Sequence, residues 1–438
     1  MGFETIPETD IQYGLISFDA EGNERSEQSG LMSQAVIKRA VADSVTNVFF
    51  FCHGWQGDLP AAKDQYGKWL RAFADAADWQ RAPQRFPKFR PLLIGLHWPS
   101  KPWGDEELRG GSFGVAGGVS GRDALVQIYA ERLGNRPEIR RLLEIIIDEA
   151  RTNAAPEELP SHLHQAYLDL NDALGLKSEG VGGSPDGDRE GFDPQSAFEA
   201  ANEQATSFGV DFNFGGLLGP LRQLSYWTMK KRARDIGEGG MHKFLNDLQE
   251  ATATQNMRVH LMGHSFGTIV VSGMVGGPNA QGRLVRPVDS VVLVQGAVSL
   301  WCYASAIPFP GAGAGYFSRI LAGKKVRGPL LTTRSRFDDA VGVFYPLASR
   351  IKGSASFAGG LPEFGGIGAY GIQGVADNMS NDLVMKEAMD DYSFEKSKVY
   401  NLDGSAYIAH KEGPGGAHCD IASPEVAHAI WEAAFASI

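Results

Sequence analysis

Short apolar runs of strand length alternate along the chain with stretches that have the apolar spacing of helices. The run at 47–54, NVFFFCHG, is almost continuously apolar, and PLLIGLHWPS at 91–100 has the same character. Such runs are typical of strands that are buried on both faces of a parallel sheet. The strands that we predict lie at 11–19, 47–54, 91–100, 257–265, 290–298, 328–335 and 397–404. Because helical patterns separate them, we predict an α/β fold with a mostly parallel, doubly wound sheet.

A long segment without strand-like runs interrupts this alternation. Residues 104–235 contain helical stretches such as PEIRRLLEIIIDEA at 137–150, and a polar, Gly-rich, acidic stretch near 177–194 predicts a mobile loop. We therefore predict a core formed by 1–103 and 236–438 with a helical insertion at 104–235. Segments inserted at the carboxyl end of such a sheet lie over the ligand crevice, so we expect a cap. A domain packed on the side of the sheet and an oligomer contact are the alternatives.

Composition excludes several classes of function. Of 438 residues, 43% are hydrophobic and 21% are charged, and the net charge of −11 argues against nucleic acid as a partner. The basic cluster KKRAR at 230–234 is expected on the solvated face of a helix. The apolar runs are too short for a membrane helix, the start lacks the pattern of a signal peptide, and three cysteines form no disulfide framework. We therefore expect a cytoplasmic protein without stable membrane insertion; export by another route and the oligomeric state stay open.

The pattern G-x-S-x-G occurs twice, as GHSFG around Ser265 and as GGSFG around Ser112. A nucleophile elbow needs a buried strand, a tight turn and a helix, because the serine occupies a strained turn crowded by backbone. The run RVHLM precedes Gly263-His264, and the small, apolar residues after Gly267 fit a packed helix. No strand precedes Ser112, and a poor helix former follows it. The sequence therefore predicts Ser265 as a nucleophile and leaves Ser112 as its rival.

A serine nucleophile needs a base at neutral pH, and the base needs an acid that orients it. In a sheet of this kind, these residues stand on loops after later strands, in the order serine, acid, histidine. Asp338 and Asp339 follow the predicted strand at 328–335, and His418 stands in a Gly-rich loop before the last helix. We predict Asp338 as the acid, with Asp339 as the alternative, and His418 as the base.

Other histidines are rivals for the role of the base. His264 is adjacent to Ser265 in the chain, so its side chain should point away from the hydroxyl. His410 is nearer the final strand, and His428 falls within the final helix pattern. Chain order, loop position and glycine context together favour His418.

An oxyanion that develops during acyl transfer needs backbone N–H donors. One predicted donor is Phe266, the residue after the nucleophile. The other is Trp55, in the loop that His53 and Gly54 begin after an early strand. A strand-end turn with a packed Trp is the plain alternative for HGW, and both interpretations can hold together.

With these residues in place, the chain resembles the α/β-hydrolase superfamily. The resemblance rests on GHSFG and HGW after strands, an Asp after a late strand and a His before the last helix, and it covers about 11–103 and 236–438. LHWPS, SRFDDAV and HCDIxxPEV are similar to bacterial serine hydrolases of largely unassigned substrate. The resemblance implies acyl transfer to water through an acyl-serine, hence an esterase or lipase-like enzyme.

The sequence offers no sign of a cofactor. No phosphate-binding loop is present, and the ligand-type residues His162 and His164 diverge on a helix, so we expect neither a nucleotide nor a metal. Cys52 and Cys419 stand near the predicted site, as redox-sensitive groups or as space-filling residues. The expected partner is a small-molecule or lipid-like ester. A thioesterase or amidase with the same triad, and a non-catalytic binding protein, are the alternative functions.

Overall fold

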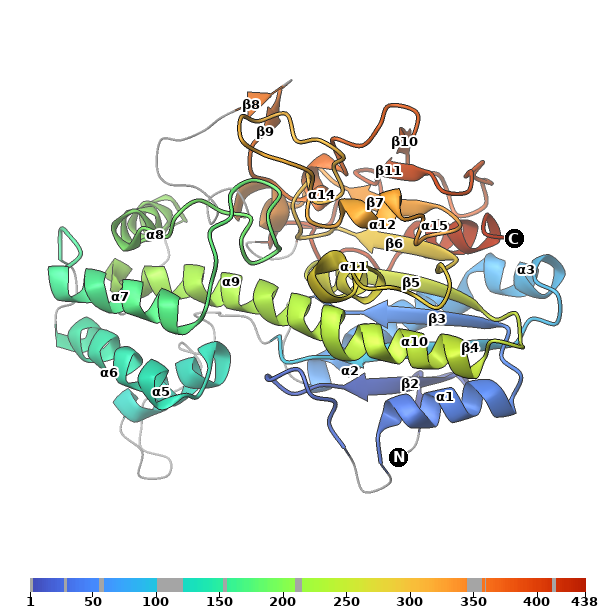
Figure 1. Cartoon of the computed structure of the whole chain (residues 1–438), viewed down its shortest axis with the longest axis horizontal. Helices are drawn as coiled ribbons and strands as arrows, with labels where there is room; N and C mark the ends of the chain where they lie inside the picture. Colours follow the sequence, from blue (N-terminus) through green and yellow to red (C-terminus); the bar gives the residue numbers. More distant parts are fainter. Residues whose placement is uncertain are drawn as a thin grey trace.

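A nine-stranded sheet forms the centre of the computed structural model, in the order β1-β2-β4-β3-β5-β6-β7-β11-β10 (Figure 1). The structure describes residues 3–26, 30–54, 59–100, 121–152, 156–208, 215–344, 357–358, 360–411 and 415–438. Strand β1 is antiparallel to β2, and the other neighbouring strands of this sheet are parallel. The sheet strands are β1 (Glu4–Thr5), β2 (Gln12–Ser17), β3 (Asn47–Cys52), β4 (Pro91–His97), β5 (Arg258–His264), β6 (Ser290–Val294), β7 (Leu330–Arg334), β10 (Ser380–Val384) and β11 (Val399–Asp403).

Each predicted strand is present in this sheet, and the predicted α/β fold is confirmed. The sequence analysis missed β1, the edge strand β10, and a separate hairpin of β8 (Phe357–Ala358) and β9 (Leu361–Pro362). These segments are very short or, in the case of β10, mostly exposed. They therefore lack the long apolar run that marks a buried strand.

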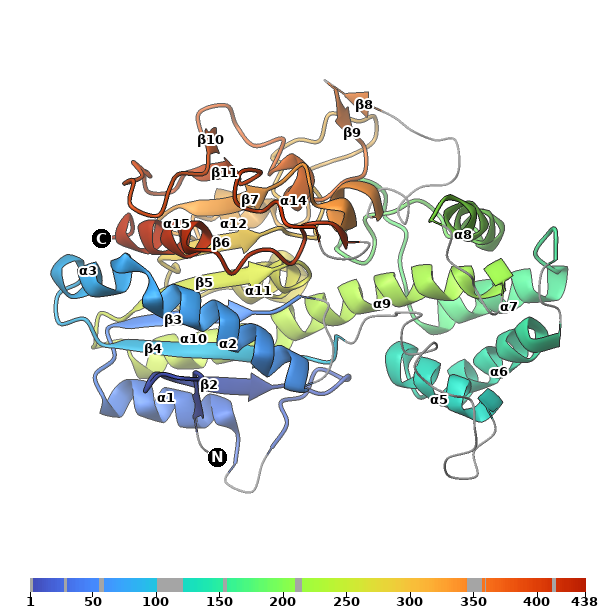
Figure 2. The same cartoon turned by 180° about the vertical axis from the view of Figure 1, so that it is seen from behind.

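Helices cover both faces of the sheet. The face in Figure 1 carries α1 (Met32–Ala42), α10 (His242–Ala251) and α11 (Gly267–Gly276), which share one core with β3, β4 and β5. The face in Figure 2 carries α2 (Leu59–Asp75), α3 (Ala77–Arg85) and α15 (Pro424–Phe435), which form a second core. The short helices α12 (Ser318–Ala322) and α14 (Ile367–Tyr370) lie in connections of the later strands. The two apolar cores hold the sheet rigid, so the loops at its carboxyl edge start from fixed positions.

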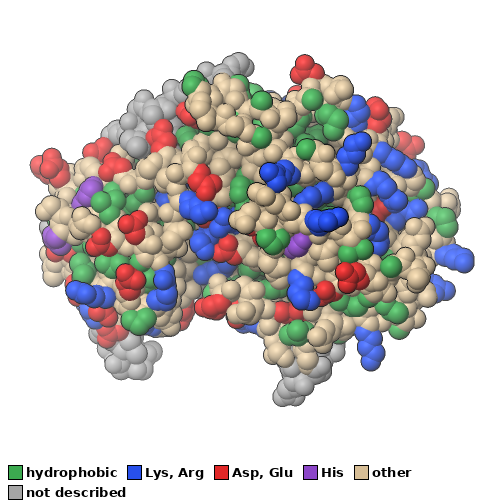
Figure 3. Space-filling view, in the orientation of Figure 1, with side chains coloured by type: hydrophobic (Ala, Val, Ile, Leu, Met, Phe, Trp, Pro, Cys, Tyr) green, Lys and Arg blue, Asp and Glu red, His purple; other side chains and the backbone are tan. Residues whose placement is uncertain are grey.

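The segment between β4 and β5 forms a helical subdomain beyond the carboxyl ends of the strands (Figures 1 and 2). Its helices are α5 (Gly121–Leu133), α6 (Pro137–Thr152), α7 (Ser161–Ala173), α8 (Pro194–Phe208) and α9 (Gly219–Ile236). They enclose an apolar core of their own. Acidic and basic side chains are intermixed on the side of this subdomain that Figure 3 shows. The apolar stripe of α6 belongs to this subdomain core and does not pack against the sheet.

Helix α9 has no loop at the predicted boundary after residue 235. It continues through a π-helical turn, Gly237–Met241, into α10, which packs on the sheet. At Gly237, a side chain would collide with the backbone of Val270 in α11. The glycine thus allows the helix to pass close to α11, and one continuous rod joins the subdomain to the sheet.

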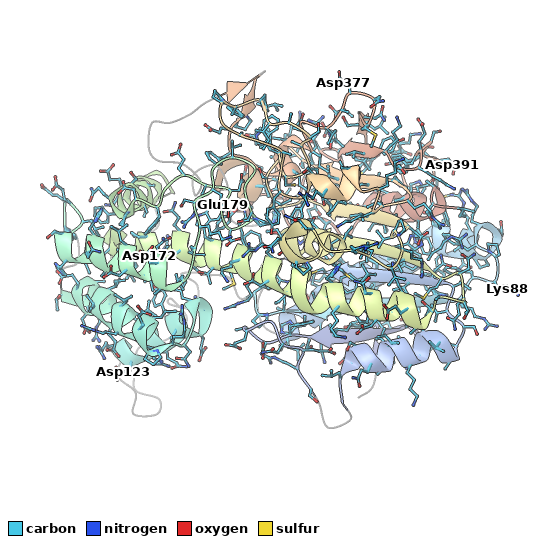
Figure 4. The ribbon with its side chains drawn as sticks, in the orientation of Figure 1. Lys88, Asp123, Asp172, Glu179, Asp377 and Asp391 are labelled. Carbon is cyan, nitrogen blue, oxygen red and sulfur yellow. The ribbon has the colours of Figure 1, made fainter. Side chains whose placement is uncertain are left out.

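The acidic stretch near 177–194 is not an exposed polar loop. Residues from Ser184 to Arg189 are buried, and the Gly182 carbonyl accepts a hydrogen bond from the Tyr316 N–H at 3.0 Å. Asp188 Oδ1 accepts the Gly182 N–H at 2.6 Å. Glu179, labelled in Figure 4, lies in this stretch between the helical subdomain and the sheet. A polar, acidic composition predicts an exposed loop, because the sequence of the stretch does not show which cations neutralise its carboxylates.

One of those cations, Arg234, belongs to the basic cluster on α9, and another, Lys177, pairs with Glu179 within the stretch itself. The expected helix is correct, but the expected solvated face is wrong, because Lys230, Arg232 and Arg234 are buried. Arg234 Nε lies 3.1 Å from Asp186 Oδ1, and Arg232 donates to the carbonyl oxygens of Pro99 and Arg132 at 2.9 and 3.0 Å. Burial lowers the pKa of Lys230 to about 7, against the opposing effect of nearby aspartates. Buried charges of this kind are tolerated only where such partners are present.

Within the described part of the chain, every helix is too short or too polar to span a lipid bilayer.

Candidate active site

Ser265 occupies the turn between β5 and α11, with a backbone φ of 55°. A non-glycine residue in this left-handed region costs on the order of 1–3 kcal/mol and persists only where its surroundings enforce it. The Ser265 N–H donates to the carbonyl oxygen of Val294 at 3.1 Å, and the Thr268 N–H and hydroxyl both donate to the Ser265 carbonyl. The turn therefore holds its strained serine by hydrogen bonds on both sides.

Three glycines surround this serine at close quarters. A side chain at Gly267 would collide with the carbonyls of Cys52 and His53, and one at Gly263 would collide with the backbone of Gly267. A side chain at Gly54 would strike Ser265 itself. The glycines predicted to support the elbow thus allow the ends of β3 and β5 to approach each other.

A chain of hydrogen bonds joins Ser265 to His418 and Asp338. The hydroxyl Oγ of Ser265 lies 2.7 Å from His418 Nε2, and His418 Nδ1 lies 2.8 Å from Asp338 Oδ2. Ser265 and Asp338 are buried, and the His418 side chain is 12% exposed, so the series is shielded from solvent except at the imidazole. With Nδ1–H donated to the carboxylate, Nε2 is free of its proton and can accept one from the hydroxyl.

The structure distinguishes the two neighbouring aspartates. Asp338 is fixed by a backbone bridge to Gly416, by the Val341 N–H at 3.0 Å from Oδ1, and by Gln295 Nε2 at 2.9 Å from Oδ2. Asp339 instead pairs with Lys411 at 2.9 Å, and both side chains are partly exposed. Only Asp338 has the position required of an acid that orients His418.

The rival histidines do not reach the serine hydroxyl. Nε2 of His264 lies 2.9 Å from the carbonyl oxygen of His418, and the ring meets Trp69 edge-on. Burial and the neighbouring His418 hold the pKa of His264 well below its usual value, so the ring is neutral. His410 is exposed and its backbone N–H donates to Asp420, and His428 lies in α15, paired with Asp78. Ser112 lies outside the described residues.

His53 fixes the start of the loop after β3. Its Nδ1 lies 2.8 Å from the Gly54 carbonyl, the Trp98 N–H donates to its Nε2 at 3.4 Å, and its ring stacks on Trp98. Burial lowers the pKa of His53 to about 3, so the ring is neutral and carries its proton on Nδ1. The side chain therefore supports Gly54 rather than taking part in proton transfer. Trp55, the predicted second oxyanion donor, lies outside the described residues.

Phe266, the other predicted oxyanion donor, is the N-cap residue of α11. Its N–H therefore belongs to the positive end of that helix, beside Ser265. The ring of Phe266 meets Tyr226 of α9 at a centroid distance of 5.2 Å. The helical subdomain thus contacts the residue that follows Ser265.

Gln295 was missed in the sequence analysis. It follows β6 directly, is buried and has a φ of 45°. Its sequence context, VQG at the end of an apolar run, carries no motif. The only available signal was its position at the carboxyl end of the strand next to that of Ser265.

A second buried cluster contains residue types that can bind a metal, but both ring nitrogens of its histidine already contact oxygen atoms. Asp78, His428 and Glu432 place ligand atoms within 4.8 Å of one another. His428 Nδ1 lies 2.6 Å from Asp78 Oδ2, and its Nε2 lies 3.0 Å from the carbonyl oxygen of Asp390. Both ring nitrogens face acceptors, and these contacts raise the pKa of His428, which favours the doubly protonated ring over one with a lone pair for a cation. This cluster is an ion pair that ties α15 to α3.

Comparison of the chain with protein-family models, with curated proteins and with solved structures finds no match.

Proposed function

We propose that this chain is a serine hydrolase of the α/β-hydrolase type that cleaves carboxylic esters. The observation that carries the proposal is the hydrogen-bonded series Ser265, His418 and Asp338, with the serine strained in a strand-to-helix turn. Nucleophile, base and orienting acid in this order are what acyl transfer to water requires. The strand order and the carboxyl-edge position of all three residues support the fold assignment.

In the first half of the proposed reaction, Ser265 Oγ attacks the ester carbonyl carbon while its proton passes to His418 Nε2. Asp338 stabilises the imidazolium that forms and keeps the proton on Nδ1. The tetrahedral intermediate then breaks its bond to the alkoxy oxygen, which takes the proton from Nε2 and leaves as the alcohol. The acyl group stays on Ser265.

The second half repeats these steps with water. His418 Nε2 takes a proton from water, and the resulting oxygen nucleophile attacks the acyl carbon. Collapse of the second intermediate releases the acid and returns the proton to Ser265 Oγ. We assign the oxyanion in both halves to the N–H groups of Phe266 and Trp55.

We further propose that the helical subdomain acts as a cap. Its position beyond the carboxyl ends of the strands and the Tyr226–Phe266 contact support this role. A cap wall of aromatic and aliphatic residues would favour esters with a moderately sized apolar acyl or alkyl group. A Y226A variant should accept a different range of acyl lengths from wild type, with Y226F as the matched control. Identical length profiles in all three proteins would contradict the cap.

The test of the proposed reaction is labelling with a fluorophosphonate probe, followed by a panel of esters, thioesters and amides of increasing chain length. Labelling at Ser265 with ester turnover supports the proposal. Preference for thioesters or amides would move the enzyme to those classes with the same triad. Failure of the folded protein to react with probe or panel would identify a non-catalytic binding protein.

A further inference from the structure

Gln295 contacts the predicted acid, Asp338, and has a backbone conformation that is unfavourable for a residue other than glycine. It is buried, and its φ of 45° lies in the left-handed region. Strained, buried polar residues of this kind cluster at functional sites, where their surroundings enforce the conformation. Here the surroundings are β7 on one side and Asp338 on the other.

Thr333 of β7 fixes the direction of the Gln295 amide. The Gln295 backbone N–H donates to Thr333 Oγ1 at 3.0 Å, and the Thr333 hydroxyl donates to Gln295 Oε1 at 3.0 Å. The side-chain NH₂ group is thereby turned to Asp338, with Nε2 2.9 Å from Oδ2. The reverse orientation would place the amide oxygen against a carboxylate oxygen, where no proton is available.

Asp338 Oδ2 consequently receives two hydrogen bonds. One comes from His418 Nδ1 at 2.8 Å and the other from Gln295 Nε2 at 2.9 Å, while Oδ1 receives the Val341 N–H. These donors fix the carboxylate plane relative to the imidazole ring. The bond from Gln295 also draws negative charge away from the oxygen that attracts the proton of His418.

We propose that Gln295 is a positioning residue that aligns Asp338 with His418 and weakens the pull of Asp338 on the imidazole proton. This inference rests on the proposed hydrolase function. Gln295 acts through Asp338 and not on the substrate, so its loss should lower kcat and leave KM nearly unchanged.

The variant for the test is Q295M, which keeps the length of the side chain and removes the donor. We expect kcat to fall about 10- to 100-fold with KM within about twofold, the usual effect of losing a hydrogen bond to a charged group. The acid limb of the kcat/KM–pH profile should move to higher pH, because Asp338 then holds the imidazolium more strongly. The other charged or titratable neighbours (His264, Tyr226 and the Asp339–Lys411 pair) are common to both proteins.

A second pair of variants acts on the amide direction. T333V removes the hydroxyl that orients Gln295 and should reproduce part of both effects, whereas T333S keeps the hydroxyl and should restore wild-type values. If Q295M does not fold, T333V and T333S still test the inference. The midpoint of urea unfolding shows whether each variant is folded. Wild-type kcat and an unshifted acid limb in folded Q295M and T333V would overturn the inference. Wild-type protein that is not labelled at Ser265 by fluorophosphonate would instead overturn the proposed function.

Discussion

Nε2 of His264 donates a hydrogen bond to the carbonyl oxygen of His418 at 2.9 Å, so the residue before the predicted nucleophile supports the backbone of the predicted base. The two residues are 154 positions apart in the chain. The strained turn directs Ser265 to the imidazole of His418 and the neighbouring His264 to its main chain. A single turn therefore fixes the hydroxyl and the loop that carries its base.

This relationship predicts a role for His264 that does not depend on its charge. H264L removes the donor, so the His418 loop should relax and kcat should fall on the order of tenfold. H264Q can present an amide N–H near the position of Nε2 and should retain most of the activity. Steady-state kinetics of the two variants measure the difference. Equal activity of H264L and wild type would show that the loop carrying His418 keeps its conformation without the hydrogen bond from His264.

Replacement of the predicted nucleophile should abolish turnover and leave the fold intact. In S265A, kcat should drop by on the order of 10⁴-fold or more, because no hydroxyl remains to form the acyl intermediate. Fluorophosphonate labelling should disappear with it, and circular dichroism should be unchanged. S112A is the matched control, since its serine stands in the other G-x-S-x-G match, and it should keep both activity and labelling. The reverse pattern would transfer the role to Ser112.

The two neighbouring aspartates should respond unequally to the same substitution. D338N keeps the shape of the buried side chain but removes the negative charge that fixes the His418 tautomer and stabilises its imidazolium, so kcat should fall by about 10⁴-fold. D339N should cost at most a few-fold, because Asp339 only pairs with partly exposed Lys411. Kinetics of both variants under identical conditions decide the matter. A severe loss in D339N with a mild loss in D338N would show that Asp339, and not Asp338, is the acid.

The buried His428–Asp78 pair predicts a pH-dependent contribution to stability. Burial lowers the pKa of His428, but its bonds to Asp78 and the Asp390 carbonyl outweigh that effect and raise the pKa above its usual value. A raised pKa in the folded state means that the stabilisation is fully present below the unfolded-state value of about 6.5 and is lost as pH rises through the folded-state value.

Urea unfolding of wild type and H428Q tests this expectation. The difference in free energy of unfolding should be largest near pH 6 and should shrink as the pH rises through the raised folded-state pKa of His428. Arg81 Nη1 lies 3.0 Å from Asp78 Oδ1, and H428Q leaves Arg81 unchanged, so we expect the aspartate to keep one cationic partner in the variant. A difference that does not change with pH would contradict a charged His428.

The sequence alone determined the parts of this protein that depend on local pattern and chain order. Continuous apolar runs marked β3, β4 and β5, because a strand buried on both faces must be apolar throughout. The glycines around Ser265 marked the elbow, because only glycine fits where backbones nearly touch. Chain order then located the loops that hold Asp338 and His418.

Only the tertiary structure decided which polar groups meet. The fold places Asp338, and not its neighbour Asp339, against His418. It also brings Gln295 to Asp338, although the two residues are 43 positions apart in the chain. The cations Lys230 and Arg234 are buried because the acidic loop folds back onto α9, where Asp186 pairs with Arg234. A charged residue has the same local signature whether water or a distant counter-charge solvates it. Its burial is therefore set by long-range contacts that no short stretch of sequence encodes.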